Sequence, residues 1–367
     1  MLNCDAAVVG GGVVGAAIAY GLAEQQVDTV LIDEGDVAFR AARGNFGLVW
    51  VQSKGIGCPP YSSLTRRSAD NWLRLAEEVK QVTGVDIAYS RPGGVHLCLG
   101  EEEFTERAAV MKQLEAQTEG RFQYEMLDHR ALSEMLPGLG EDVAGGSYSP
   151  LDGHANPLFL LRGLHAGFRK RAGRALINAP VHRIRPHAGA FDVEAGNETV
   201  RAQKLVLAAG LANAKLAPDV GLRVPVHPLR GQILVSEKVR SFLRIPTLHV
   251  RQTTEGSVLM GDSHEDVGFD DGTRPDIMAE IARRATRAFP FLRSARIVRA
   301  WGALRVMTPD GIPIYDQSES CPGAFCAAAH SGITLAATHA FDLPRWIAEG
   351  ALPPELDAFS ARRFDVH

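Results

Sequence analysis

Three glycines near the start of the chain have the spacing of a phosphate-binding turn. Gly10, Gly12 and Gly15 directly follow the apolar run Val8–Val9 and directly precede a segment that we expect to form an amphipathic helix. In such a turn the first glycine permits a tight bend, the second lets backbone N–H groups approach a pyrophosphate, and the third lets the helix lie close to the strand. The spacing therefore predicts a strand–turn–helix unit that binds a dinucleotide.

Two acidic residues follow the second predicted strand at the distance that a ribose contact requires. Residues 29–32 form this apolar strand, and Asp33 and Glu34 come next, about 20 residues beyond the glycines. A carboxylate at this point accepts hydrogen bonds from an adenosine ribose. The spacing favours Asp33 for this role and leaves Glu34 as a solvated neighbour. Ordinary βα turns also contain glycines, but the strand, the helix and the acid together favour a bound dinucleotide.

The composition excludes several classes of function. The 367 residues, of which 46% are hydrophobic, are enough for two domains with a substantial core. There are 39 basic and 43 acidic residues, and no basic tract indicates a nucleic acid or an anionic membrane as a partner. The first residues lack the basic and apolar regions of a signal peptide, and no apolar stretch reaches ~18 residues. We therefore expect a soluble, cytoplasmic protein without a transmembrane segment.

The five cysteines predict no metal site. Cys4, Cys58, Cys98, Cys321 and Cys326 contain no CxxC pair and form no cluster with histidine. An odd number without such spacing is typical of buried free thiols. We interpret Cys326 as one of these, although its strand leads toward a candidate cofactor segment and a covalent link to a cofactor is the alternative.

Two further segments rich in small residues lie far downstream of the glycines. The apolar run 204–207 ends in Ala208, Ala209 and Gly210, and residues 325–337 combine a small-residue strand, a Ser–Gly junction and an apolar helix. Small side chains at a strand end leave room for a cofactor, and a helix N-terminus offers free N–H groups. Core packing explains each segment equally well when it is taken alone. Nicotinamide enzymes keep their dinucleotide motifs in one contiguous domain, so dispersed pieces favour a flavin dinucleotide.

These pieces, in this order, resemble the FAD-dependent D-amino-acid oxidase superfamily, in its glycine oxidase and sarcosine oxidase branch. The resemblance covers nearly the whole chain and includes Leu-Asp-Gly-His-Ala-Asn-Pro at 151–157, Pro-Leu-Arg-Gly-Gln at 228–232 and the tryptophan-to-proline stretch 301–313. The last of these is the most specific. Within the superfamily, residues 44–54 look most like the FAD-carrying β-subunits of opine oxidases and D-hydroxyproline dehydrogenases.

The resemblance implies an α/β fold combined with an α+β part. We expect a glutathione-reductase-like, FAD-binding Rossmann domain built from residues 1–85, 145–225 and 300–367. An interleaved substrate domain with a mixed sheet is expected to comprise residues 86–144 and 226–299.

The resemblance also implies which residues contact the FAD. They are Gly10, Gly12, Val13, Val14, Gly15, Asp33, Glu34, Arg40, Arg43, Gly44, Asn45, Phe46, Gly47, Leu48, Val181, Ala208, Ala209, Gly210, Ser331, Gly332, Ile333 and Thr334. The chain departs from the family's pattern at two points. Arg43 stands where relatives tend to have a small serine, and the tryptophan that is common after the Ala-Ala-Gly strand is absent.

Arg305, in the tryptophan-to-proline stretch, is the principal candidate for the substrate site. In relatives the arginine of this motif holds the substrate carboxylate, and a planar guanidinium suits that role because it donates two parallel hydrogen bonds. A structural ion pair is the alternative. His249 and His264 lie in a predicted hairpin over residues 247–264, at positions that resemble pocket positions of glycine oxidases, where a neutral imidazole favours the deprotonated amine. His154 is expected to be structural.

The function implied by the resemblance is oxidation of a small amino acid or secondary-amine carboxylate, with hydride transfer to flavin N5. The likeness of residues 44–54 implies a catalytic β-subunit of a hetero-oligomer, with other subunits as partners. Two alternatives stay open: a stand-alone glycine, D-amino-acid or sarcosine oxidase that uses oxygen, and a non-catalytic subunit that carries FAD.

Overall fold

The computed structural model describes residues 1–35, 41–187 and 189–365. Its largest sheet has eight strands in the order β16-β17-β11-β1-β2-β8, with β10 and β9 joined beside β11. These strands are β1 (Leu2–Val9), β2 (Thr29–Asp33), β8 (Arg174–Ile177), β9 (Val181–His187), β10 (Ala190–Ala195), β11 (Glu198–Leu207), β16 (Ile314–Gln317) and β17 (Ala324–Ala328). The predicted α/β fold is confirmed, and the sheet contains both parallel and antiparallel pairs.

Parallel pairing brings the predicted cofactor segments to one edge of this sheet. Strand β1 pairs in parallel with β2 and with β11, and β11 pairs in parallel with β17. Val9 is therefore opposite Ile32 on one side and Leu207 on the other, and Leu207 is opposite Cys326. Because parallel strands end at the same edge, the segments that follow residues 9, 33, 207 and 328 lie close together.

Helix α1 (Val13–Glu24) is buried on all sides, and the prediction of an amphipathic helix is wrong here. Its residues 15–23 are all buried. One set of its side chains, including Tyr20, joins a core shared with α2 (Pro59–Thr83) and α5 (Pro157–Lys170), and another set, including Leu22, joins a core shared with α8 (Ala336–Glu349). A helix enclosed in this way needs no polar face.

The remaining sheets form the other end of the molecule. A four-stranded antiparallel sheet has the order β13-β14-β12-β15, and a three-stranded one has the order β4-β6-β5. Their bounds are β4 (Gly94–Leu99), β5 (Glu125–Asp128), β6 (Val143–Ser149), β12 (His227–Lys238), β13 (Val250–Gln252), β14 (Ser257–Met260) and β15 (Ile297–Met307). The helices of this end are α3 (Glu101–Gln117), α4 (His129–Met135) and α7 (Pro275–Ala288), while the short α6 (Asn213–Leu216) follows β11.

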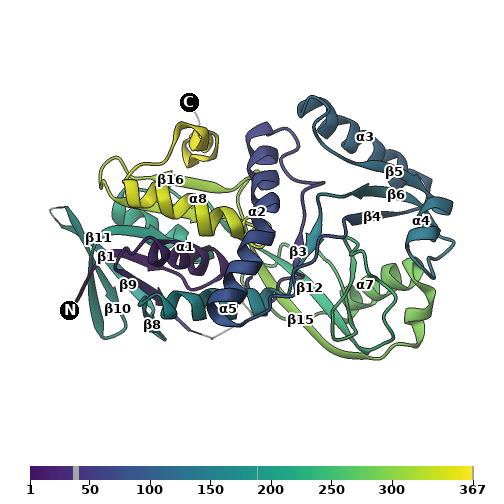
Figure 1. Ribbon diagram of the computed structural model, residues 1–367, viewed down its shortest axis with the longest axis horizontal. Helices are drawn as coiled ribbons and strands as arrows, with labels where there is room; N and C mark the ends of the chain where they lie inside the picture. The colour runs from purple at the N-terminus through teal and green to yellow at the C-terminus, as the bar shows by residue number, and fades with distance from the viewer. Residues whose placement is uncertain (36–40, 188, 366–367) are drawn as a thin grey trace.

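The two ends are joined by α2 and by a two-stranded sheet of β3 (Leu48–Val49) and β7 (Gly153–His154). Figure 1 shows α1 and α8 at one end, α3, α4 and α7 at the other, and α2 with β3 between them. The predicted hairpin is present as the antiparallel pair β13–β14. Across the described ranges, no helix combines the length and the apolar character needed to cross a membrane.

Candidate functional site

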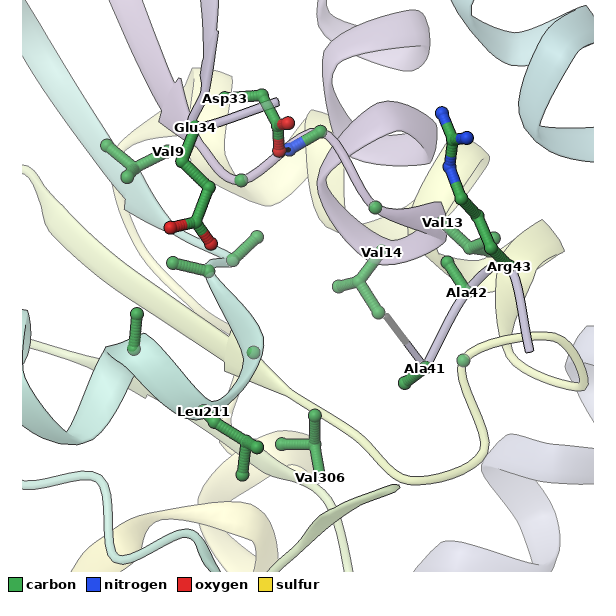
Figure 2. Close-up of a pocket in the computed structure, with 18 of the residues that line it drawn as sticks. Val9, Val13, Val14, Asp33, Glu34, Ala41, Ala42, Arg43, Leu211 and Val306 are labelled. Atoms are coloured by element: carbon green, nitrogen blue, oxygen red, sulfur yellow. Dashed lines mark hydrogen bonds between the residues drawn. The ribbon is translucent and has the colours of Figure 1, made fainter. Parts of the chain in front are cut away.

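A cavity of about 1070 Å³ lies at the shared edge where the parallel strands end. Among the predicted cofactor contacts, those that line it are Gly10, Gly12, Val13, Val14, Asp33, Glu34, Arg43, Asn45, Val181, Ala208, Ala209, Gly210, Gly332 and Ile333. Figure 2 shows Val14 and Ala41 facing the same space as Leu211 and Val306, which come from distant parts of the chain. The start, middle and end of the sequence therefore build one cavity.

The three glycines of the first turn lack a side chain for different structural reasons. Gly10 has a φ of +107°, and a Cβ there would overlap the carbonyl of Ala208. A Cβ on Gly15 would overlap the carbonyl of Gly10. A Cβ on Gly12, in contrast, would meet only Ala42, at 3.8 Å. The protein itself does not crowd Gly12, and the open space beside it, at the N-terminus of α1, fits a pyrophosphate that approaches the free N–H groups of the helix.

The two acidic residues after β2 differ in what they contact. Asp33 accepts hydrogen bonds from the backbone N–H of Gly11 at 2.6 Å and of Gly35 at 2.8 Å. Its carboxylate therefore holds the glycine turn, while its oxygens keep lone pairs for a further donor. Glu34 is exposed, and in Figure 2 its carboxylate points into the cavity. The structure thus places both residues at the cavity, and the ribose contact expected of Asp33 stays a prediction.

Seven of the predicted contacts do not line the cavity. They are Gly15, Gly44, Phe46, Gly47, Leu48, Ser331 and Thr334. Arg40 lies outside the described residues. The space at Gly44 and Gly47 is taken by the protein, since a Cβ would overlap Ala303 at Gly44 and the carbonyl of Ala155 at Gly47.

The last predicted cofactor segment is held in place by α2. Tyr61 donates its hydroxyl hydrogen bond to Ser331 at 2.8 Å, and the Trp72 indole N–H donates to the carbonyl of Thr334 at 3.0 Å. The helix expected to begin at the Ser331–Gly332 junction begins only at Ala336, because residues 331–335 form a turn first. The cavity is therefore faced by this turn rather than by the first turn of α8.

Sequence reasoning missed several residues of the cavity wall. His165 on α5 contacts the carbonyl of Gly11 through Nε2 at 2.8 Å, and His330 ends the segment that follows β17. Burial and the positive charges of Lys54 and Arg305 hold the pKa of His330 well below its usual value, so its imidazole is neutral at neutral pH. The position of His330, two residues after the parallel strand β17, was a usable signal, whereas nothing in the local pattern marked His165.

Arg305 lies on β15 between two residues that line the cavity, Leu304 and Val306. It is half-buried, and its Nη2 donates to Oδ2 of Asp262 at 2.6 Å. Its Nη1 donates to the carbonyl of Ser263 at 2.7 Å and, more weakly, to that of Arg230 at 3.2 Å. The predicted alternative of an ion pair is therefore present, but it uses only part of the guanidinium.

The two candidate histidines occupy different environments. His264 is exposed, and its Nε2 lies 3.7 Å from Oδ2 of Asp262, so it belongs to the surroundings of Arg305. His249 instead packs edge-to-face against His96 of β4, with 5.9 Å between ring centroids. Burial lowers the pKa of His249 to about 4, so it carries no charge at neutral pH.

Two other residues singled out from the sequence, His154 and Cys326, have packing contacts. His154 is buried on β7 and its Nδ1 lies 3.3 Å from Nη1 of Arg251. Cys326 is buried within β17, does not line the cavity, and has its thiol pKa raised by burial. In the part of the chain that the structure describes, no group of three or more His, Cys, Asp or Glu residues has the geometry of a metal site.

Comparison with known proteins agrees with this geometry. Residues 5–343 match the FAD dependent oxidoreductase family. The chain is 41% identical to an opine oxidase subunit of Agrobacterium tumefaciens (strain Ach5), over 99% of this chain and 98% of that protein. It is also 41% identical to the opine oxidase subunit of the same name from Rhizobium meliloti, over 100% and 99%.

A solved structure gives the same fold. The crystal structure of glycine oxidase from Geobacillus kaustophilus superposes with a TM-score of 0.91 at 25% identity, over 100% of both chains. The open cradle at Gly12 and the dispersed cavity walls fit the FAD that this family uses. The chain belongs to the FAD dependent oxidoreductase family and is an FAD-dependent amine or amino-acid oxidoreductase.

Proposed function

We propose that this chain dehydrogenates a small amino acid or secondary-amine acid, and that Arg305 binds the carboxylate of the substrate. The observation that supports the proposal most directly is the number of guanidinium N–H groups of Arg305 that donate no hydrogen bond within the protein. Of its five N–H groups, two on Nη1 and one on Nη2 donate to Ser263, Arg230 and Asp262. The Nε–H and the second N–H of Nη2 meet no acceptor among residues 1–35, 41–187 and 189–365. Two donors on neighbouring nitrogens can hold both oxygens of one carboxylate.

The residues around Arg305 bear on the orientation of the substrate and on the charge beside its nitrogen. FAD, when bound, supplies the hydride acceptor at flavin N5. The protein's task is to hold the α-carbon near that acceptor and to leave the nitrogen lone pair available, which a clamp on the carboxylate achieves through orientation. His330 at the cavity wall has a pKa well below its usual value, so it adds no positive charge that would oppose the developing iminium.

We further propose that the chain is the catalytic subunit of a hetero-oligomer and passes electrons to a redox centre in another subunit. The two 41%-identical relatives support this, because both are named as one subunit of an opine oxidase and both align along their whole length. A stand-alone oxidase that reduces oxygen is the second candidate, and the likeness to glycine oxidase, with a TM-score of 0.91, favours it.

A substrate panel tests the proposed reaction. The purified holoenzyme is mixed without oxygen with amino acids and secondary-amine acids, and bleaching of the flavin absorbance is followed. We expect bleaching by at least one carboxylated amine and none by the matching amine without a carboxylate. Bleaching by both members of such a pair at equal rates would contradict the assignment of Arg305.

A further inference from the structure

Phe269 is a large apolar side chain that is open to solvent at the wall of the cavity. It is 75% exposed, and it lines the cavity together with Asp271. Both residues belong to the loop 261–274 between β14 and α7, so they come from the end of the molecule that holds the antiparallel sheets. A single exposed apolar side chain is common on protein surfaces. A phenyl ring at a cavity wall, however, can leave water when a ligand fills the cavity.

The loop that carries Phe269 is anchored by one buried arginine, Arg230 of β12, which is 1% exposed. Its Nη2 donates to Oε2 of Glu265 at 2.7 Å, and its Nη1 donates to Oδ2 of Asp270 at 2.5 Å. The backbones of Arg230 and Glu265 also exchange two hydrogen bonds, at 2.9 and 3.0 Å. Phe269 directly precedes Asp270, so the segment that carries the phenyl ring is held between two fixed points.

The same loop runs along β15, the strand that carries Arg305. Near the start of the loop, Asp262 accepts the hydrogen bond from Nη2 of Arg305. Near its end the backbone lies against the strand, since a Cβ on Gly302 would overlap the carbonyl of Gly272. The residues of β15 that line the cavity are Leu304 and Val306. The loop therefore joins the surroundings of Arg305 to the wall of the cavity.

We propose that Phe269 packs against the flavin half of bound FAD and closes this side of the cavity over it. The inference rests on the proposed function, because hydride transfer requires the flavin ring to lie beside a substrate that Arg305 holds. Contact with the flavin removes the phenyl ring from water, and it requires no movement of the anchored backbone. It also shields the flavin from solvent. The adenosine half is expected instead at Asp33, after β2.

The first test follows the release of FAD from the holoenzyme. The protein is diluted, and the fluorescence of free FAD gives the rate constant of release. Phe269→Ala should release FAD about tenfold faster, because the contact of the ring with the cofactor is lost. Phe269→Trp keeps an aromatic ring and should release FAD at nearly the wild-type rate. Phe291→Ala removes another exposed phenylalanine, one that does not line the cavity, and should leave the rate unchanged.

A second measurement distinguishes the two halves of FAD. Dissolved iodide quenches the fluorescence of a flavin only where solvent reaches the ring. The quenching constant should be several-fold larger in the Phe269→Ala holoenzyme than in the wild type, and it should keep the wild-type value in Phe291→Ala.

Two outcomes would overturn the proposal. An unchanged rate of FAD release in Phe269→Ala would show that the ring does not contact the cofactor and would leave it free to contact a partner chain. Faster release without greater quenching would place Phe269 over the adenosine half. Both measurements are made without substrate, so failure of the role assigned to Arg305, which is seen in flavin bleaching by substrate, is distinguishable from failure of this inference.

Discussion

Oδ2 of Asp262 lies 2.6 Å from Nη2 of Arg305, so a carboxylate of the protein is bound to the guanidinium that we assign to the substrate. Asp262 compensates the charge of Arg305 before any ligand arrives. A ligand's carboxylate therefore meets a guanidinium that is already partly neutralised, and a ligand's ammonium meets an acceptor beside it.

Asp262→Asn separates these two effects. With the compensating charge removed, a simple carboxylate such as acetate should bind several-fold more tightly, because Arg305 is then an unpaired cation. A secondary-amine acid should bind less tightly, since its ammonium loses an anionic partner. Both affinities are measurable by titration of the holoenzyme. A change in the same direction for both ligands would contradict the placement of Asp262 at the substrate's nitrogen.

Gly12 and Gly15 should respond differently to a side chain. Gly12→Val should remove FAD, because the added methyl groups fill the open space beside the helix N-terminus, yet leave the thermal midpoint of the apoprotein nearly unchanged. Gly15→Val should lower that midpoint as well, because its Cβ would overlap the carbonyl of Gly10. FAD content and apoprotein unfolding report the two effects. Full FAD occupancy in Gly12→Val would show that the pyrophosphate lies elsewhere.

The half-buried pair His96 and His249 should make the enzyme sensitive to acid. Burial lowers the pKa of His96 to about 2 and that of His249 to about 4, so the folded chain stays neutral at both rings while the unfolded chain takes up protons below about 6.5. Stability from these groups is present above that value and is lost as the pH falls toward 4, by at most about 1.4 kcal/mol per pH unit for each ring.

The check is thermal unfolding of the holoenzyme at pH 7 and at pH 5. The decrease in the thermal midpoint from pH 7 to pH 5 should be smaller in His96→Leu than in the wild type. His187→Leu, which replaces an exposed histidine of β9, serves as the matched control and should keep the wild-type loss. Equal losses in all three proteins would show that His96 and His249 do not set the acid sensitivity.

The proposed hetero-oligomer predicts a preference among electron acceptors. Native purification from the source cell should recover other chains in a fixed ratio with this one. An artificial dye should then support faster turnover than oxygen, because the natural acceptor is a redox centre in another subunit. A single kind of chain that turns over rapidly with oxygen alone would favour the stand-alone oxidase instead.

The cavity at the ends of the parallel strands was largely predictable because its parts carry strong local signals. Glycines at fixed spacing, an acid after the next strand and small residues at Ala208–Gly210 each reflect a backbone requirement that sequence displays directly. The sequence also predicts cofactor contacts at Gly44 and Gly47, which owe their lack of side chain to neighbouring protein atoms. A glycine in a sequence indicates that another group lies close to the backbone. It does not indicate whether that group belongs to a cofactor or to the protein itself.

The titratable side chains around Arg305 were less predictable because their proximity depends on tertiary contacts. Asp262 follows β14, Lys54 follows β3 and His330 follows β17, and no spacing in the sequence relates these positions. The local pattern also predicted an amphipathic helix for α1. The helix is instead buried on both faces, because each face packs against a separate core. The division of the chain into a cofactor domain and a substrate domain at residues 86–144 and 226–299 stays a prediction.

The central claim, that Arg305 clamps the substrate's carboxylate beside bound FAD, is tested most directly by anaerobic flavin reduction in Arg305→Ala. The variant should keep its FAD, because Arg305 does not line the cofactor cavity. Its reduction by a carboxylated amine should lose about 3 kcal/mol of transition-state stabilisation, on the order of a hundredfold in the rate constant divided by the dissociation constant. Arg305→Lys should recover only part of this, since an ammonium lacks the guanidinium fork. Wild-type reduction kinetics in Arg305→Ala, with FAD fully bound, would contradict the account.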